Sequence, residues 1–532
     1  MRAERLFRAL GLVDPALVEE ALAARRRAWK RWAALAACLA LATGLGFGWR
    51  VTGGFNGYGS GMSGGDSGSS GGAVSGDSGS PADPGATGSG GAEEGIAFMS
   101  CAGPVLPLTA AEDSAALTAE RTVTWDFARG AYPDGEPRQW GAEVTDAYVL
   151  RNDTEEDAAV TALYPFAGNF SDLAKVRPAV TADGETVETD LYAGPYSGGF
   201  QPAFGAEEPD TMNLADLNGW TAYKALLEDG TYLEQALGAY PVLDTPATVY
   251  EFSDFEAPHE AYQAATQTVS FRVDPEKTTV LTYGFNGCEW DGDFRRYSYF
   301  VPDGKRNEPE MKLLVVLGED IGDYALQGYQ DGGCDRGEEI DGVSCTVTRG
   351  ETTLDAVLDR LCRDYAERYA RGRARDQDNA FDAVPFTMYR GAVAELLAQY
   401  GPLSGAPMDR YADGRLDDIL AETLSHDRVL YLGFPVTVPA GGSVSVECRL
   451  WKEPSYDFGG SGSENVGLQG YDLAVRLGSG LAFTRQSAAL VNTENVEITG
   501  QNFGFDPETG VTGVELDLEQ EHYYLEVRPR EE

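Results

Sequence analysis

The stretch VLYLGFPVTVPAGGSVSVECRL, residues 429–450, shows the strand pattern of this chain most clearly. Two runs of alternating apolar residues, Val429–Val438 and Ser443–Leu450, flank four turn residues at 439–442. Period-two alternation is typical of a strand with one buried face, and a short glycine-containing turn between two such runs is typical of a hairpin. We therefore predict an antiparallel hairpin at this position.

Three more pairs of short apolar runs surround polar or proline-containing turns, and single runs follow toward the C-terminus. Many short strands separated by turns are typical of antiparallel sandwiches, so we predict a mainly β fold. The three further hairpins pair Ala147–Leu150 with Ala159–Phe166, Thr268–Val273 with Thr279–Phe285, and Tyr297–Val301 with Met311–Leu317.

Two segments carry apolar residues at helical spacing instead. The shorter lies between Leu214 and Leu237, where glycines interrupt it. The longer runs from Thr352 to Ser425, and its apolar stripes predict helices that cover a face of a sheet. The predicted fold class is therefore mainly β with an α insert (α+β), with an antiparallel β-sandwich-like outer body.

An apolar run from Trp32 to Trp49 follows the basic cluster at residues 25–31. A helix of this length rises about 27 Å, close to the thickness of the hydrocarbon core of a bilayer. Because positive charge stays on the cytoplasmic side, we predict a single-pass plasma-membrane anchor with a cytoplasmic N-terminus and the remaining chain outside. Two alternatives stay open: a signal peptide cleaved after Ala42, and a lipidated cysteine at Cys38.

The segments around the anchor complete the predicted organisation. Residues 50–95 are dominated by glycine and serine, so we expect a disordered tether. Residues 1–31 carry an apolar helical face that rests on a partner or on the membrane, or else form an unstructured tail. The predicted division is a cytoplasmic amphipathic segment at 1–31, a transmembrane helix at 32–49, the tether at 50–95, a β-rich ectodomain at 96–349, a helical insert at 350–427 and a C-terminal β-sandwich portion at 428–532.

Charge follows the same division. The whole chain has a net charge of −44, whereas residues 1–31 hold eight basic and four acidic residues, which leaves −48 for the rest. So acidic an outer part disfavours nucleic acid as a partner. Within the apolar run, Ala36, Ala40, Gly44 and Gly48 recur at every fourth position, a pattern that favours a homodimer through the membrane helix.

Carboxylates and aromatic residues gather in the segment CEWDGDF, residues 288–294. Glycosidases need two carboxylates at a defined separation, lined by aromatic rings that stack on sugar. Glu289, Asp291 and Asp293 are therefore candidate catalytic residues, and Trp290 is a candidate ligand-binding residue. The usual motifs of nucleophilic, zinc and nucleotide chemistry are absent from the sequence.

A second aromatic segment contains Tyr192, Tyr196 and Phe200 among glycines and a proline, and it is a candidate loop for binding glycan or peptide. Cys334 and Cys345 flank an acidic loop and are the first candidates for a disulfide. The acidic loop is a candidate calcium site, because hard cations prefer clustered carboxylates, although its spacing differs from that of an EF-hand. The candidate calcium ligands are Asp331, Asp335, Glu338, Glu339 and Asp341.

The openings RLFRALGLVDPALVEEAL (5–22) and ARRRAWKRWAALAACLALATG (24–44) resemble those of uncharacterised single-pass surface proteins of Gram-positive gut bacteria. Some similar openings belong to membrane-anchored anti-sigma-type regulators, although the HxxxCxxC zinc element of that class is missing here. The runs at 95–108 and 145–168 also resemble the surface proteins. This resemblance implies placement at the cell surface and no particular activity.

Together these patterns predict a membrane-anchored extracytoplasmic binding or sensing protein without catalytic activity, whose ligand is an envelope glycan or a protein. Two alternatives from other classes are a carboxylate-dependent hydrolase of cell-envelope glycan, acting through residues 289–293, and an anti-sigma-type transmembrane regulator.

Overall fold

The computed structural model describes residues 98–530, apart from gaps at 113–115, 132–137, 139, 198, 203–213, 216, 218, 304–310, 373–378 and 459–464. The predicted cytoplasmic segment, membrane helix, tether and small-residue stripe (Ala36, Ala40, Gly44 and Gly48) lie outside the described residues. Within the described ranges, no helix has both the length and the apolar character that a membrane crossing requires. This part of the chain is mainly β with a smaller share of helix, as predicted.

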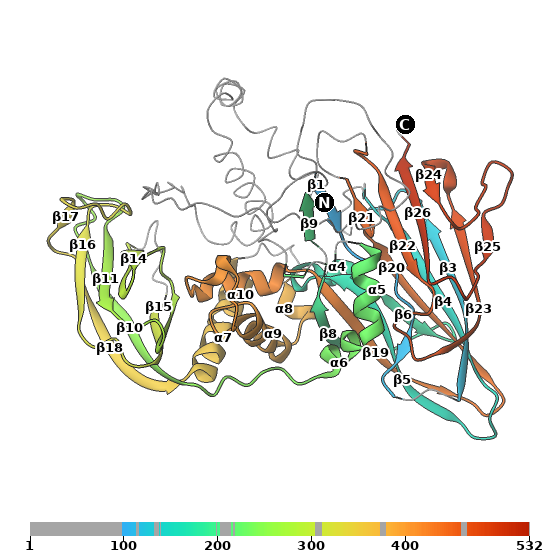
Figure 1. Ribbon diagram of the computed structural model, residues 1–532, viewed down its shortest axis with the longest axis horizontal. Helices are drawn as coiled ribbons and strands as arrows, with labels where there is room; N and C mark the ends of the chain where they lie inside the picture. Colours follow the sequence, from blue (N-terminus) through green and yellow to red (C-terminus); the bar gives the residue numbers. More distant parts are fainter. Residues whose placement is uncertain are drawn as a thin grey trace, which may run out of the picture.

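Residues 246–353 form a sandwich of two antiparallel sheets, at the left of Figure 1. The sheet β12-β15-β10-β18 faces the sheet β13-β14-β11-β16-β17, and aromatic side chains including Phe252, Phe285 and Tyr299 fill the space between them. The strands are β10 (Pro246–Glu256), β11 (Thr266–Arg272), β12 (Thr278–Tyr283), β13 (Gly287–Asp291), β14 (Phe294–Phe300), β15 (Lys312–Gly318), β16 (Tyr324–Tyr329), β17 (Glu339–Ile340) and β18 (Ser344–Thr353).

Three more sheets form a larger body at the right of Figure 1, built from both ends of the described chain. Their orders are β2-β5-β19-β8, β25-β23-β3-β4-β20-β6-β7 and β24-β26-β22-β21-β1-β9, with β3 and β23 parallel. The strands are β1 (Phe98–Cys101), β2 (Thr109–Ala110), β3 (Leu117–Asp126), β4 (Ala142–Asn152), β5 (Ala158–Gly168), β6 (Ala179–Ala182), β7 (Glu185–Thr186), β8 (Asp190–Tyr196), β9 (Gly199–Pro202), β19 (Arg428–Val438), β20 (Ser443–Lys452), β21 (Tyr456–Asp457), β22 (Gln469–Ala474), β23 (Ala482–Val491), β24 (Val496–Gln501), β25 (Gly513–Glu515) and β26 (His522–Pro529).

The four predicted hairpins are wrong in their pairing, although their strands form. β19 pairs with β5 and β8, whereas β20, which follows it after a short turn, pairs with β4 and β6 in another sheet. The predicted pairs β4 with β5, β11 with β12 and β14 with β15 also lie in different sheets. The three of these connections that the structure describes throughout, at 153–157, 273–277 and 439–442, are therefore arches between sheets. Burial explains this, because residues 428–434 of β19 are buried on both faces and need a covering layer as well as neighbouring strands.

Two of these arches lie side by side and are joined by hydrogen bonds. The backbone N–H of Asn152 donates to the carbonyl of Gly442 at 3.0 Å, and that of Gly441 donates to the carbonyl of Thr154 at 3.0 Å. Asn152 Nδ2 also donates to the carbonyl of Val438 at 3.1 Å. Gly441 has a φ of +63°, a left-handed conformation that favours glycine. The arches thus continue the β5–β19 and β4–β20 pairings to the end of the body.

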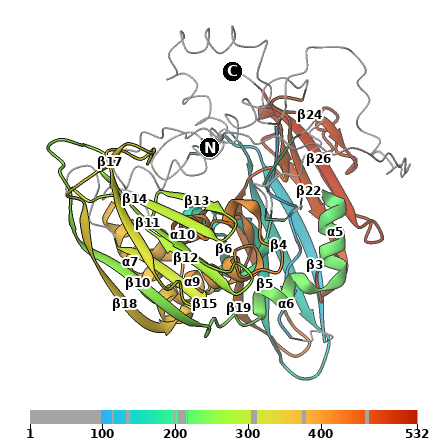
Figure 2. The same ribbon diagram turned by 60° about the vertical axis from the view of Figure 1, so that its left-hand side comes forward.

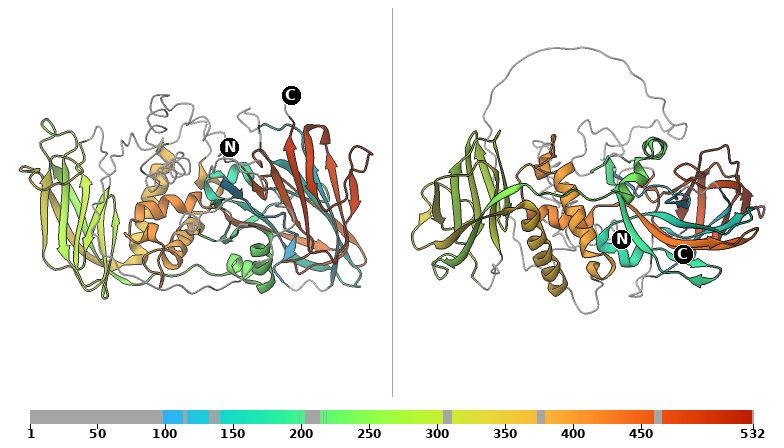
Figure 3. Two further views of the ribbon diagram at one scale, coloured as in Figure 1. Left: turned by 45° about the horizontal axis from the view of Figure 1, so that its top comes forward. Right: turned by 90° about the horizontal axis from the view of Figure 1, so that it is seen from below.

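Helices between residues 354 and 425 lie between the two β bodies, as Figure 2 and Figure 3 show from other sides. Their predicted apolar stripes are buried, and they join the outer face of β12-β15-β10-β18 and the larger body into one hydrophobic core. The prediction that these helices cover a sheet face is therefore confirmed. The helices are α7 (Leu354–Gly372), α8 (Ala380–Ala383), α9 (Phe386–Gln399), the short 3-10 helix η3 (Asp409–Tyr411) and α10 (Leu416–Ser425).

The shorter predicted helical segment also forms two helices, and Gly230 separates them with a φ of +77°. The division of the outer chain differs from the predicted one, because strands from segments 96–349 and 428–532 share sheets. The sandwich at 246–353 and the helices that follow it therefore interrupt one β body. The remaining helices are α4 (Leu173–Val176), α5 (Trp220–Asp229), α6 (Thr231–Leu237), η2 (Phe170–Asp172) and η4 (Thr493–Asn495).

Candidate functional site

The predicted catalytic carboxylates lie on the exposed hairpin β13–β14, beside arginines. Glu289 Oε2 is 2.5 Å from Arg296 Nη2, and Asp293 forms an ion pair with Arg272. Both carboxylates are thus engaged in ion pairs at the surface, and the third candidate, Asp291, lies on the same exposed strand as Glu289.

The predicted aromatic residues differ in their exposure to solvent. Trp290 is 49% exposed, and the guanidinium carbon of Arg295 lies 5.9 Å from its ring centroid. Tyr196 is the last residue of β8 and is only 3% exposed, so the prediction that it belongs to an open binding loop is wrong. Tyr192 is half-buried on the same strand, and Phe200 lies on β9. The apolar strand β19 beside β8 explains why this segment is internal.

The acidic loop uses carboxylates to hold its own backbone. Asp331 Oδ1 accepts from Gly333 N at 2.9 Å, and Glu339 Oε2 accepts from Gly337 N at 2.8 Å. Across the residues that the structure describes, no group of three or more His, Cys, Asp or Glu side chains is placed to hold a metal ion. The candidate ligands Asp331, Asp335, Glu338, Glu339 and Asp341 all belong to this described part of the chain.

The predicted disulfide does not form, since Cys334 and Cys345 are both free thiols. Cys334 is buried in the loop before β17, where its Sγ lies 3.8 Å from the carbonyl oxygen of Asp331. Cys345 lies on β18 beside Tyr299. Burial raises the pKa of the Cys334 thiol to about 11, so it stays protonated at neutral pH.

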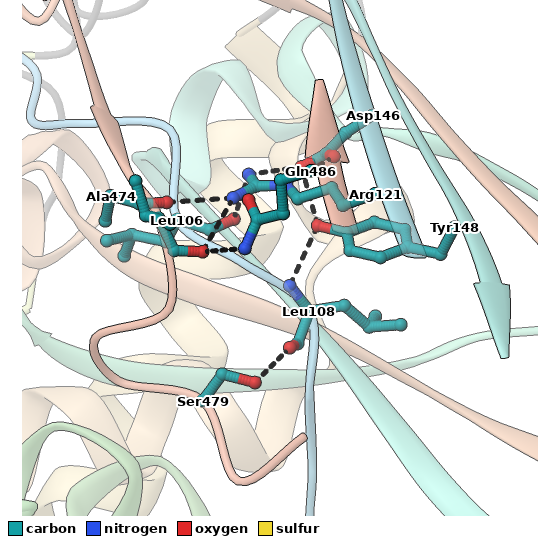
Figure 4. A network of polar contacts seen from close by, with 9 residues as sticks. Leu106, Leu108, Arg121, Asp146, Tyr148, Ala474, Ser479 and Gln486 are labelled. Carbon is teal, nitrogen blue, oxygen red and sulfur yellow. Dashed lines mark hydrogen bonds and ion pairs between the residues drawn. The ribbon is translucent and has the colours of Figure 1, made fainter. Parts of the chain in front are cut away.

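The larger body contains a buried arginine whose donors are all used (Figure 4). Arg121 on β3 is 1% exposed, and its Nε and Nη2 both donate to Asp146 at 2.8 Å. Nη1 donates to the carbonyl of Ala474 at 2.8 Å. Tyr148 extends the network by donating to Asp146 and accepting from Leu108 N. This network fixes the chain before β2 and the end of β22 to β3 and β4, and it is structural.

In a second buried arginine, only some of the N–H donors have a hydrogen-bond partner among the described residues. Arg428, the first residue of β19, is 1% exposed, and its Nη2 donates to Glu395 Oε2 of α9 at 2.7 Å. Its Nε and Nη1 have no hydrogen-bond partner in the described part of the chain. An arginine has five N–H donors, so three of them are left without an acceptor in the interior. This is the most unusual polar group that the structure describes.

Aromatic rings pack on this guanidinium. Its central carbon lies 4.2 Å from the ring centroid of Tyr196 and 5.4 Å from that of Phe170. The Tyr196 hydroxyl is also buried and has no hydrogen-bond partner among the residues that the structure describes. Burial raises the pKa of Tyr196, so this hydroxyl remains protonated and able to donate. Burial opposes the charge of Arg428, yet the electrostatic effects of Tyr196 and Glu395 leave its pKa above the ordinary value.

The side of the site nearer to solvent consists of amides and tyrosines. Gln235 of α6 donates to Glu395 Oε1, and Gln399 Nε2 lies 3.5 Å from the same oxygen. Tyr400 is half-buried, and its ring centroid lies 5.7 Å from that of Tyr196. Half-buried Tyr240 rests on Gly391 of α9, where a Cβ atom would lie 2.3 Å from its ring. A glycine in this helix therefore allows the close approach.

A second polar group adjoins the site along α10. His426 Nε2 lies 2.8 Å from the Tyr411 hydroxyl, which donates to Glu422, and Arg410 pairs with the same carboxylate. The His426 ring meets the Tyr196 ring edge-on at 6.0 Å. Burial acts to raise the pKa of Glu422, but its bond to His426 and the charge of Arg410 outweigh burial, and the pKa lies below its ordinary value. This carboxylate is therefore ionised and already occupied.

Tyr196, which packs on Arg428, was a predicted ligand-binding residue, whereas Arg428 and Glu395 were not among the predicted site residues. A signal for both exists in the sequence, because each charged residue interrupts an apolar run: Arg428 begins RVLYLGF, and Glu395 lies within AVAELLA. Buried charges are rare unless they are paired. That they meet each other depends on how the helices pack, and spacing alone does not reveal it.

No family model matches the chain, and a search of curated proteins found no similar sequence. The function of the site is therefore argued from its own geometry: a buried guanidinium with open donors, aromatic rings packed on it, and amides and tyrosines on the side toward solvent.

Proposed function

We propose that this chain is a single-pass, membrane-anchored extracytoplasmic binding protein without catalytic activity, and that Arg428 is the centre of its ligand site. The observation that carries the proposal is the buried guanidinium with three unused N–H donors. Ligand sites are mostly apolar and hold a few convergent polar groups, and the rings of Tyr196 and Phe170 around Arg428 match this description. The predicted anchor and tether would present the body outside the cell.

The test uses the full-length protein in detergent micelles. It is incubated with solubilised envelope polysaccharide and with envelope protein, and both retained material and released fragments are measured. We expect retention without released fragments. The variant Arg428→Met with Glu395→Met removes both buried charges together and should abolish retention, since removing a pair is tolerated better than leaving one charge unpaired.

The matched control removes another arginine–glutamate pair, Arg360→Met with Glu251→Met, which is partly exposed and bidentate. We expect this control to retain as much material as the wild type. Released fragments, or equal retention by the Arg428/Glu395 variant, would contradict the proposal.

A carboxylate-dependent hydrolase is the second candidate function, and two carboxylates on α10 favour it. Burial raises the pKa of Asp418 to about 6, whereas the pKa of Glu422 four residues later is lowered. Carboxylates whose pKa values are driven apart are typical of acid and base pairs. To act as a base, Glu422 would have to exchange its bonds to Tyr411 and Arg410 for a bond to the substrate. If this pair acts on glycan, Asp418→Asn should abolish fragment release in the same incubation. If no fragments appear with the wild type, this candidate is rejected.

A further inference from the structure

We infer that the group of the ligand that binds Arg428 is a carboxylate. This inference rests on the proposed binding function and adds the chemical class of the ligand. The site has a surplus of donors, because both oxygens of Glu395 are engaged, by Gln235 and by Arg428. The unused groups, three guanidinium N–H and the Tyr196 hydroxyl, all require an acceptor.

Charge favours a single negative charge on that acceptor. Glu395 already balances the charge of Arg428, so each negative charge on the ligand adds repulsion in a buried site, and a doubly charged phosphate is disfavoured more than a singly charged group. A neutral carbonyl group would engage the donors but would not use the attraction of the guanidinium. A carboxylate combines one charge with a planar pair of acceptors, which matches the planar donors of arginine.

The rings around Arg428 restrict the direction of approach. Tyr196 packs at 4.2 Å from the guanidinium carbon, which leaves the edge of the guanidinium rather than this face for the ligand. Burial raises the pKa of the half-buried Tyr240 and Tyr400, and Arg428 lies close enough to both rings to offset part of that rise. We place the entry beside these two tyrosines, which must shift when the carboxylate enters, because Arg428 itself is buried.

The experiment is calorimetric titration of the full-length protein in detergent with acetate, acetamide and inorganic phosphate at constant ionic strength. Acetate should bind saturably, with a Kd on the order of 1 mM because it has few atoms. Acetamide should bind at least about tenfold more weakly, because it lacks the negative charge that strengthens the hydrogen bonds to Arg428. Phosphate should also bind at least about tenfold more weakly, because it adds a second negative charge to a buried site.

Tyr196→Phe should weaken acetate binding several-fold, and it loses no hydrogen bond of the unliganded protein. Tyr232→Phe is the matched control, because its buried hydroxyl also lacks a partner but belongs to a separate apolar cluster with Tyr431. This control should bind acetate as the wild type does. The Arg428→Met with Glu395→Met variant should not bind acetate.

The outcomes separate the two proposals. Equal binding of acetamide, or tighter binding of phosphate, would overturn the carboxylate inference. Absence of acetate binding would overturn it as well, and the proposed function would then stand if envelope retention still depended on Arg428. Absence of both acetate binding and Arg428-dependent retention would overturn the proposed function together with the inference.

Discussion

At the scale of single residues, the two buried arginines each have one carboxylate partner. They differ in how many of their N–H donors form hydrogen bonds. Arg121 meets Asp146 with two nitrogens and a carbonyl with the third, whereas Arg428 meets Glu395 with one nitrogen only. A polar group that is buried and unsatisfied costs free energy. The protein tolerates this cost at Arg428, and binding of a ligand there would recover it.

The hydroxyls beside the two arginines provide a first prediction. Tyr148→Phe removes hydrogen bonds to Leu108 N and Asp146, so we expect the free energy of unfolding to fall by about 1–3 kcal/mol. Tyr196→Phe removes no partner and should leave it unchanged or slightly higher. Urea denaturation of both variants measures the difference. An equal loss in both would mean that Tyr196 has an acceptor that the described residues do not supply.

A second prediction concerns Asp418, whose pKa burial raises from 3.8 to about 6. The folded state then holds this proton more tightly than the unfolded state, so the contribution of Asp418 to stability is full below about pH 4 and is lost as pH rises through about 6. Because the side chain is 37% exposed and beside Arg415, screening limits the effect.

Asp418→Asn should therefore raise the free energy of unfolding near pH 7, by less than about 1 kcal/mol, and make little difference near pH 4. Denaturation of wild type and variant at both pH values measures this. A loss of stability near pH 7 would show that the ion pair with Arg415 outweighs the burial of Asp418.

At the scale of strands and helices, the sequence predicted which segments form and missed how they pair. The stripes of α7, α9 and α10 and the strand at 429–438 were found, because periodicity reports which side of an element is buried. The same pattern does not distinguish edge-to-edge pairing from face-to-face packing. β19 and β20 therefore looked like a hairpin although they lie in different sheets.

The candidate site was hidden for a related reason. Glycines and proline around Tyr196 suggested an exposed loop, whereas the residue is buried under α9 and α10 beside Arg428. The residues of α9, β8 and β19 that meet at the site are far apart in the sequence, so no local spacing predicts their contacts. The exposed carboxylates and Trp290 were easier to notice because they are close together in the chain.

Engineered disulfides test the arch topology. Thr437 and Ala159 are opposite each other on β19 and β5, and both side chains are exposed. Cross-strand neighbours have Cα atoms about 4.5–5.5 Å apart, which suits a disulfide. Thr437→Cys with Ala159→Cys should therefore oxidise readily, as measured by mobility under non-reducing conditions.

Thr437→Cys with Val444→Cys is the control, since these residues would be opposite each other in a hairpin but lie in separate sheets here. It should not form an intramolecular disulfide. If this control formed a disulfide efficiently and the first pair formed none, the arch would be contradicted and the predicted hairpin supported.

At the scale of the whole molecule, one hydrophobic core runs from the larger β body through the helices to the outer face of β12-β15-β10-β18. Arg428 lies where β19 meets α9, within this continuous region. The sandwich at 246–353 is thus firmly joined to the part that holds the candidate site.

The proposed membrane placement gives a prediction for intact cells. Because the glycine- and serine-rich segment 50–95 is expected to be an exposed tether, brief protease treatment should release a fragment that begins within it. Immunoblotting of cells and supernatant detects the fragment, and a cytoplasmic protein serves as the lysis control. Full protection in intact cells combined with cleavage after lysis would place the body inside.

The most direct measurement of the central claim is the NMR signal of the Arg428 Nε–H during titration of the full-length protein with acetate. Arg121 Nε, which already donates to Asp146 at 2.8 Å, is the internal reference. If the free donors of Arg428 form the ligand site, its Nε–H signal should shift progressively to saturation while that of Arg121 stays in place. An unchanged Arg428 signal, or equal shifts of both, would contradict the claim.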